Sequence, residues 1–378
     1  MRLASRRCSS CNVSVEVKRT TTNAVKEPTQ NNIQEQPTLT DYKDSVRDKT
    51  KAYRGIREVA FYETLHFAST LSSTSDILSY IEHKSLLSNL GYFDSTALSL
   101  AYYARDSVVT PSVQSYTRSL HALANEVQAL KQLSAFTSSY FGVVDLEILN
   151  DKDRRNTSSG PQQYNIMRKP HLLLQNLTAP FHRPNIIDIK MGTQTYEPNA
   201  PVSKQKREVA KYPQQAEIGF RIVGMRVHNN DPSSESDDGS DGEYKCWDKS
   251  FGVKLRTRND VIHAFMTFFN CNNAQNVPNT RHVLTSVIKQ LTRIKQWFEE
   301  ENSTLAFYAS SILIVYDDSR GAPQLDMTTS RRNSFQDPVL KMIDFAHVCR
   351  HTGGDLGYLK GICSLLGILN EIHKSKTL

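Results

Sequence analysis

Two stretches of the sequence place charged side chains inside apolar runs, where a charge is costly to bury unless it has a partner. In "RPNIIDIKMG" (183–192), Asp188 and Lys190 are two residues apart, so on a β-strand they share one face. In "LKMIDFAHV" (340–348), Asp344 interrupts a second apolar run. Phosphoryl transfer uses an acid to hold Mg²⁺, a lysine to neutralise the moving phosphoryl group and an acid to orient the attacking hydroxyl. These residues therefore predict a phosphoryl-transfer site.

Each stretch also has a simpler interpretation. Asp188 and Lys190 alone could be a structural ion pair, and an Asp-Phe pair such as the one at Asp344 is common. The sequence has no glycine-rich Walker loop and no His-Arg-Asp catalytic loop. It therefore fits neither a P-loop enzyme nor an ordinary protein kinase.

The elements that would position these residues follow from the spacing of apolar side chains. Strands are expected at 140–149, 184–192, 218–228, 310–317 and 340–348, and helices at 54–71, 118–136, 203–211, 260–269, 281–300 and 356–373. Alternating strands and helices in the C-terminal half indicate a mixed α/β or α+β domain.

Length and composition limit the classes of protein. The 378 residues allow two lobes, and no apolar run is long enough to cross a bilayer. The net charge of +7 favours polyanions such as nucleic acid, anionic lipid or small phosphates, without choosing among them. Aromatic residues interleaved with a basic tract, which nucleic-acid binding would require, are absent from the sequence. The six scattered cysteines indicate reduced thiols in the cytoplasm or nucleus.

Three segments do not fit the pattern of a folded core. Residues 1–40 are polar and are expected to be disordered; their basic, acid-poor start also resembles a mitochondrial transit peptide. Residues 76–117 remain unassigned. The acidic, Ser- and Gly-rich segment 229–244 is expected to be an exposed loop.

Three motifs together resemble one family. "PNIIDIKMG" (184–192) matches the P-x-x-x-D-x-K-x-G signature of the inositol polyphosphate kinases. "SSILIVYD" (310–317) and "MIDFAH" (342–347) resemble that family's two later motifs, in the same order. The resemblance is continuous over 170–378 and is greatest to the multikinase group. Upstream, only "RGIREVAFYE" (54–63) resembles the family.

The resemblance implies a two-lobed α+β fold of the ATP-grasp or protein-kinase-like type. Residues 41–174 would form the ATP-binding N-lobe, and 175–378 the catalytic, inositol-phosphate-binding C-lobe. Asp188 would lie at the attacking hydroxyl, Lys190 would contact the transferred phosphate and the substrate, and Asp344 would be the magnesium ligand. Gly192, Ser311 and His347 would support them.

Substrate recognition is expected from the short helix after the signature. Lys204, Arg207 and Lys211 are three and four residues apart and line one face of it, which predicts binding to inositol phosphate. The alternative is a solvated basic face.

The resemblance implies that ATP binds through Asn176 and through a lysine on an early strand. Lys43 and Arg47 are the candidates for that lysine, although neither lies in an obvious strand.

The resulting hypothesis is a monomeric kinase, dependent on ATP and Mg²⁺, that phosphorylates soluble inositol tris- and tetrakisphosphates. It would need no nucleic acid and no membrane span, and weak contact with anionic lipid stays open. An inositol hexakisphosphate kinase that makes pyrophosphates, and a catalytically weak scaffold with a degenerate ATP site, are the alternatives.

Overall fold

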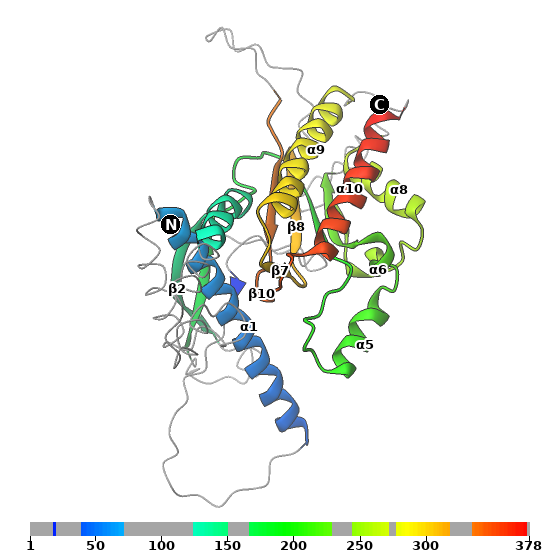
Figure 1. The fold of residues 1–378 in the computed structure, drawn as a ribbon. Helices are drawn as coiled ribbons and strands as arrows, with labels where there is room; N and C mark the ends of the chain where they lie inside the picture. The colour runs from blue at the N-terminus through cyan, green and yellow to red at the C-terminus, as the bar shows by residue number, and fades with distance from the viewer. Residues whose placement is uncertain are drawn as a thin grey trace, which may run out of the picture.

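The computed structural model describes residues 18–19, 39–71, 124–149, 166–228, 244–271, 277–317 and 335–375. Two larger β-sheets and one two-stranded sheet, with helices beside them, give an α+β fold in two lobes (Figure 1). The expectations for residues 76–117, and for nearly all of the tail 1–40, fall outside the described residues. No helix in the described part combines the length and apolar character of a membrane span.

A five-stranded antiparallel sheet forms the centre of the C-terminal lobe, in the order β6-β5-β4-β8-β9. All seven residues of β8 are buried, as expected for a strand covered on both faces. In this order β4 and β8 each have a hydrogen-bonded strand on both sides, which fixes the positions of their side chains. The strands are β4 (Pro184–Met191), β5 (Phe220–His228), β6 (Tyr244–Trp247), β8 (Ser311–Asp317) and β9 (Val339–Ile343).

Three long helices pack beside this sheet: α8 (Arg258–Phe268), α9 (Val277–Glu300) and α10 (Leu356–Lys374). The helix α8 contacts β5, α9 contacts β9, and α10 contacts both β4 and α9 (Figure 1). The apolar stripe expected on the long helix is confirmed, because all its members are buried: Leu284, Val287, Leu291, Ile294 and Phe298.

The N-terminal end of β5 lies against α10 through two glycines. Gly219 has a φ of 81°, and a Cβ atom there would lie 2.7 Å from the Cα atom of Gly361. Side chains at these positions would push the helix away from the sheet.

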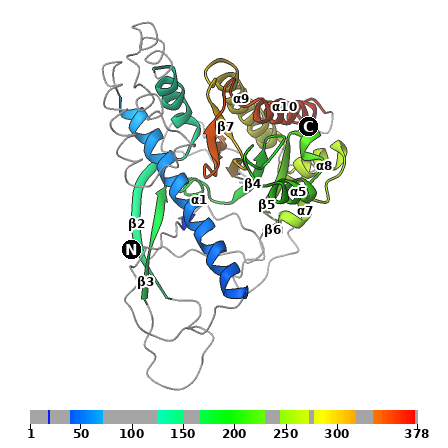
Figure 2. The same cartoon turned by 60° about the horizontal axis from the view of Figure 1, so that its bottom comes forward.

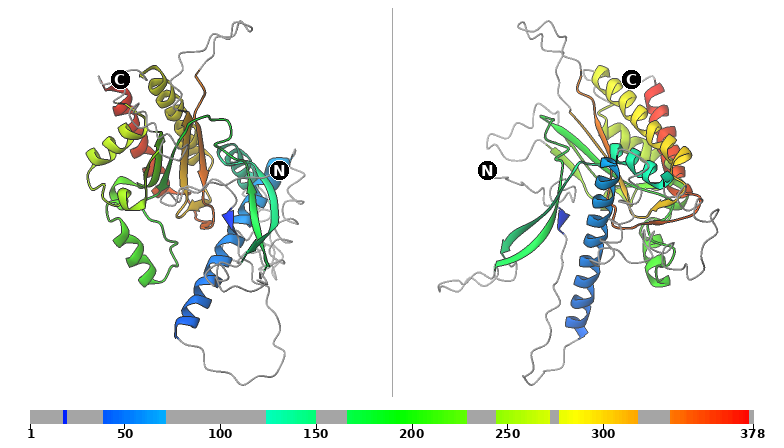
Figure 3. Two further views of the ribbon diagram at one scale, coloured as in Figure 1. Left: turned by 180° about the vertical axis from the view of Figure 1, so that it is seen from behind. Right: turned by 60° about the vertical axis from the view of Figure 1, so that its left-hand side comes forward.

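The second sheet has the order β1-β3-β2 and lies beside α1 (Leu39–Thr70), as Figures 2 and 3 show. Its strands are β1 (Lys18–Arg19), β2 (Tyr140–Leu149) and β3 (Ile166–Leu174). The helix α1 also reaches the other lobe, because the Phe61 ring packs 4.8 Å from Phe345 and 6.2 Å from Phe307. It therefore joins the two lobes.

Short elements complete the described part. They are the 3-10 helix η2 (Ser134–Phe136), α5 (Val202–Lys211), α6 (Gln215–Ile218), α7 (Lys249–Gly252), β7 (Leu305–Phe307) and β10 (Val348–Arg350). The strands β7 and β10 pair with each other.

Several expected boundaries differ from the structure. The strand expected over 340–348 is wrong beyond Ile343, because Asp344 takes a left-handed backbone conformation and the chain turns before β10. The helix expected at 54–71 is the second half of α1. Of the helix expected at 118–136, residues 124–133 are helical and are followed by η2.

The strand expected over 218–228 begins only at Phe220, since Ile218 ends α6. The expectation that the acidic loop extends to Tyr244 is also wrong at that residue. Tyr244 is the first residue of β6 and pairs with His228, and residues 229–243 lie outside the described part.

Candidate functional site

Asp188 and Lys190 lie on β4, and the alternation of the strand directs both away from the buried side chains of Ile187, Ile189 and Met191. The ammonium group of Lys190 donates a hydrogen bond of 2.9 Å to the carbonyl oxygen of Ala309. Its Nζ atom also lies 3.8 Å from Oδ2 of Asp344. Two of the three charges expected at a phosphoryl-transfer site are therefore adjacent.

Asp344 approaches Lys190 across the width of one strand. In the sheet register, Lys190 lies opposite Ser311 on β8, and Ser311 lies opposite Ile343 on β9. Asp344 follows directly, with a φ of 69°. A non-glycine residue in this region is strained, and such strain is concentrated at functional sites. The strained turn directs an acid toward the lysine from the adjoining end of β9.

Ser311 and Gly192 lie around this pair, as the family resemblance implies. The Ser311 hydroxyl is buried and has no hydrogen-bond partner among the described residues, so it could bond a ligand. Gly192 has a φ of 92°, which favours glycine, and its carbonyl oxygen accepts a 2.9 Å hydrogen bond from the Gln215 side chain. This bond ties the end of β4 to α6.

His347 belongs to a charged cluster that the sequence did not reveal. Its Nδ1 atom lies 2.7 Å from Oε1 of Glu197, and the same oxygen accepts a 2.5 Å hydrogen bond from Arg57 of α1. Arg57 donates a second bond, of 3.1 Å, to the carbonyl oxygen of Val348. Burial disfavours the carboxylate of Glu197, but the bonds and charges of His347 and Arg57 outweigh it and lower the pKa of Glu197 to about 2.

The cluster joins three distant segments of the chain: α1, the segment after the signature and the turn after Asp344. Glu58, the neighbour of Arg57, accepts a 3.3 Å hydrogen bond from the backbone N–H of Phe345. Arg57 and Glu58 thus bond to the two ends of the turn, at Val348 and Phe345, and hold α1 against it. In the sequence, only the family resemblance of "RGIREVAFYE" pointed to this part of α1, and the residues that bond to it could not be identified.

The basic helix α5 differs in one respect from the expectation. Lys211 donates two hydrogen bonds of 2.7 Å to the carboxylate of Glu208, and Arg207 lies 3.9 Å from it. Lys204 is half-buried and forms no ion pair with a described residue. Two of the three expected substrate cations therefore already face an acid.

The ATP-side candidates lie in unlike places. Asn176 is exposed just after β3, and its side-chain oxygen accepts hydrogen bonds of 2.9 and 2.8 Å from the N–H and hydroxyl of Thr178. Lys43 and Arg47 both lie on α1, so neither is on a strand. Lys18 does lie on a strand, β1, opposite Leu172 of β3. A strand of two residues leaves almost no pattern in the sequence, so this strand was not expected.

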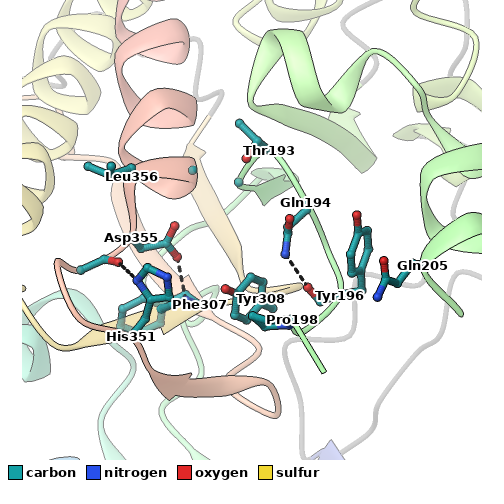
Figure 4. A pocket seen from close by; sticks show the side chains of 14 residues that line it. Thr193, Gln194, Tyr196, Pro198, Gln205, Phe307, Tyr308, His351, Asp355 and Leu356 are labelled. Carbon is teal, nitrogen blue, oxygen red and sulfur yellow. Dashed lines mark hydrogen bonds between the residues drawn. The ribbon is translucent and has the colours of Figure 1, made fainter. Parts of the chain in front are cut away.

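Figure 4 shows a hollow of about 460 Å³ whose lining includes Tyr196 and Pro198, the two chain neighbours of Glu197. It is lined by residues that directly follow the signature, among them Thr193, Gln194 and Tyr196, and by Tyr308 and Asp355. Asp188, Lys190 and Asp344 do not line it. The described residues of its wall include no lysine or arginine, so this wall is poorly suited to a polyphosphate.

The metal-binding capacity of the site rests on few protein ligands. Among the described residues, no group of three or more His, Cys, Asp or Glu side chains could hold a metal ion alone. Mg²⁺ commonly uses one or two carboxylates, with substrate phosphates and water as its other ligands. Asp344, about a third exposed and beside Lys190, fits that kind of site.

Comparison with known proteins gives a family and two groups within it. A family model described as inositol polyphosphate kinase matches residues 171–370. Mouse inositol hexakisphosphate kinase 3 is 31% identical over 224 residues, which cover 55% of this chain and 52% of that protein. Human inositol polyphosphate multikinase is 32% identical over 165 residues, 42% of this chain and 36% of that protein.

The chain thus aligns with about half of the first relative's length and about a third of the second's. A solved structure of inositol phosphate multikinase Ipk2 from S. cerevisiae, in complex with ADP and Mn²⁺, is 23% identical. It superimposes with a TM-score of 0.48, covering 63% of this chain and 89% of that chain.

Proposed function

The chain belongs to the inositol polyphosphate kinase family, and we propose that it transfers a phosphoryl group from ATP to hydroxyl groups of soluble inositol polyphosphates. The observation that carries this proposal is that the Lys190 ammonium on β4 lies 3.8 Å from the carboxylate of Asp344, which directly follows β9. Asp188 lies two residues before Lys190 on the same strand. Such a set of charges suits a reaction in which negative charge moves between oxygen atoms.

Each residue has a distinct part in the proposed reaction. Asp188 accepts a hydrogen bond from the attacking hydroxyl and takes its proton as the new oxygen–phosphorus bond forms. Lys190 stabilises the charge on the transferred phosphoryl group, and the bond from that phosphorus to the ADP leaving oxygen breaks. Asp344 would hold the divalent metal ion, which would supply positive charge to the nucleotide phosphates.

His347 is proposed to support the substrate side of this site. The bond from Nδ1 to Glu197 fixes the orientation of the imidazole ring and leaves Nε2 available for a substrate oxygen. Glu197 is thus a positioning residue for His347.

The ATP side is proposed to use Asn176 for a ribose hydroxyl and a strand lysine for the phosphates. The family resemblance implies a lysine on an early strand. Lys18 on β1 meets this requirement, and Lys43 and Arg47 on α1 do not. We therefore propose Lys18 in place of the two residues expected from sequence spacing.

Within the family, we favour a multikinase that acts on tris- and tetrakisphosphates. The short α5, of ten residues, supports this assignment, because a small recognition element tolerates several substrates. A hexakisphosphate kinase is the second candidate, since relatives of both kinds match at nearly the same identity. A monomer in the cytoplasm or nucleus stays a prediction from the sequence.

One assay separates these functions. The purified protein is incubated with Mg-ATP and either inositol 1,4,5-trisphosphate or inositol hexakisphosphate, and the products are resolved by anion-exchange chromatography. A ladder to tetrakis- and pentakisphosphate supports the multikinase, and pyrophosphate products from hexakisphosphate support the second candidate. No product from either substrate would contradict both and leave the scaffold.

A further inference from the structure

Glu208 lies in the middle of the face that α5 is proposed to offer to the substrate. It follows Lys204 by four residues and precedes Lys211 by three, and both spacings place side chains on the same side of a helix. A carboxylate at this position opposes the binding of phosphate groups.

The Glu208 carboxylate engages two cations of its own helix. It accepts two hydrogen bonds of 2.7 Å from Lys211 and lies 3.9 Å from Nε of Arg207. Only 14% of its side chain is exposed, against 46% for Lys211 and 64% for Arg207. Glu208 is thus the most buried member of the group, and the side chains of Lys211 and Arg207 are the more exposed ones.

The charge of Glu208 also acts on an arginine of β5, the strand beside β4. Arg221 lies on β5 opposite Lys190 of β4. Burial lowers the pKa of the Arg221 guanidinium, and the nearby carboxylates of Glu208 and Asp188 partly offset this effect. One arginine therefore lies under the influence of both the proposed catalytic acid and the acid of the substrate helix.

We propose that Glu208 is a specificity-determining residue. Its carboxylate competes with substrate phosphates for Lys211 and Arg207, and so limits the number of phosphates that the site binds well. This inference rests on the proposed function. Lys204, which forms no ion pair with a described residue, can bind a phosphate directly. Further phosphates must displace Glu208 from Lys211, and they meet its negative charge.

The test compares Glu208→Gln with Glu217→Gln. Glu217 is an exposed acid on the neighbouring α6, so its variant loses the same charge at a position outside the group formed by Glu208, Arg207 and Lys211. Affinities for inositol tris-, tetrakis- and hexakisphosphate are measured by calorimetry without nucleotide, at low and at high salt. Glu208→Asp, which keeps the charge, serves as the conservative variant.

The expected result is a graded one. Glu208→Gln should tighten binding of the hexakisphosphate by about threefold or more relative to Glu217→Gln, equivalent to about 0.7 kcal/mol. The gain should be smaller for the trisphosphate and should shrink as salt rises. Glu208→Asp should retain the wild-type order of affinities.

Two outcomes would overturn the inference. Equal effects of the Glu208 and Glu217 variants would show that only net charge matters. Weaker binding by a folded Glu208→Gln protein would show that the acid orients the cations for the substrate. If Glu208→Gln lowers the melting temperature strongly, Glu208→Ala repeats the test, and unfolding of both would make Glu208 purely structural and contradict the proposal.

Failure of this inference and failure of the kinase proposal give different results. Wild-type turnover of any inositol phosphate supports the kinase even if the Glu208 variants behave like the control. Graded binding without turnover would support the role of Glu208 and contradict the kinase.

Discussion

The Nζ atom of Lys190 on β4 lies 3.8 Å from Oδ2 of Asp344, although β8 separates the strands that lead to them. The long lysine side chain spans the position of Ser311, and the left-handed turn at Asp344 directs the acid back over the end of the sheet. A structural ion pair has no need of a strained backbone. The strain is a cost that a metal-binding role would explain.

Replacing Asp344 with Asn should abolish turnover and leave the melting curve nearly unchanged. An amide binds Mg²⁺ far more weakly than a carboxylate, whereas asparagine tolerates a φ of 69° better than most residues. Single-turnover assays over a range of Mg²⁺ concentrations would measure the effect. Retained activity at moderate Mg²⁺ would mean that the metal is held elsewhere.

From the sequence, the charged residues proposed to react could be predicted better than the residues that hold them in place. Asp188, Lys190 and Asp344 could be found because a charge inside an apolar run is conspicuous in one dimension. Glu197 and Arg57 could not, since each lies in a polar stretch and their bond joins residues 140 positions apart. The break after Ile343 was missed for a related reason: apolar residues continue on both sides of a turn set by one backbone angle.

Replacing Lys18 with Ala should raise the KM for ATP at least tenfold, and replacing Lys43 with Ala should leave it nearly unchanged. A charge-assisted bond to phosphate contributes roughly 1.5–3 kcal/mol, which is about ten- to a hundredfold in binding. Lys18 lies on a strand of the sheet that carries β3, and Lys43 lies on α1. Steady-state kinetics with ATP varied would measure both. The opposite ranking would restore Lys43 as the nucleotide lysine.

Glu197 should contribute a stability that the protein loses as the pH becomes acidic. Its folded pKa of about 2 lies below its ordinary value of 4.5, so its stabilising effect is fully present above pH 4.5 and is lost as pH falls toward 2. Glu197→Gln should therefore lower the stability by roughly 1–3 kcal/mol at neutral pH, discounted for partial exposure, and less at pH 3. Melting curves at several pH values would measure this, with Glu217→Gln as the control. A difference from wild type that did not change with pH would contradict the assignment.

Removing residues 229–243 should change catalysis little. The strands on either side form an antiparallel pair in which His228 lies opposite Tyr244, so an Asn-Gly turn can join them directly. Tyr244 must stay, because the Arg226 guanidinium lies 3.7 Å from the centre of its ring. We expect kcat/KM for the inositol phosphate to stay within about twofold of the wild-type value. A loss of more than tenfold in a folded protein would make the loop part of the site.

The last prediction concerns the cations of α5. Replacing Lys204, Arg207 or Lys211 singly with Ala should raise the KM for the inositol phosphate and leave the KM for ATP nearly unchanged. The helix aims these three side chains toward one side, and each bond to phosphate is worth roughly 1.5–3 kcal/mol before the competition from Glu208 is counted. Lys206 provides a matched control: it carries the same charge on the same helix, but it is two residues from Lys204 and points to another side.

The effect of these substitutions should grow with the number of substrate phosphates and weaken as salt rises, because exposed charges are screened. Lys206→Ala should stay close to the wild-type protein under all these conditions. Steady-state kinetics with tris- and tetrakisphosphate at two salt concentrations would measure the four variants together. If all of them kept the wild-type KM, or if Lys206→Ala lost as much as the others, α5 would be a solvated basic face. The substrate assignment would then be wrong, even if the protein proved to be a kinase.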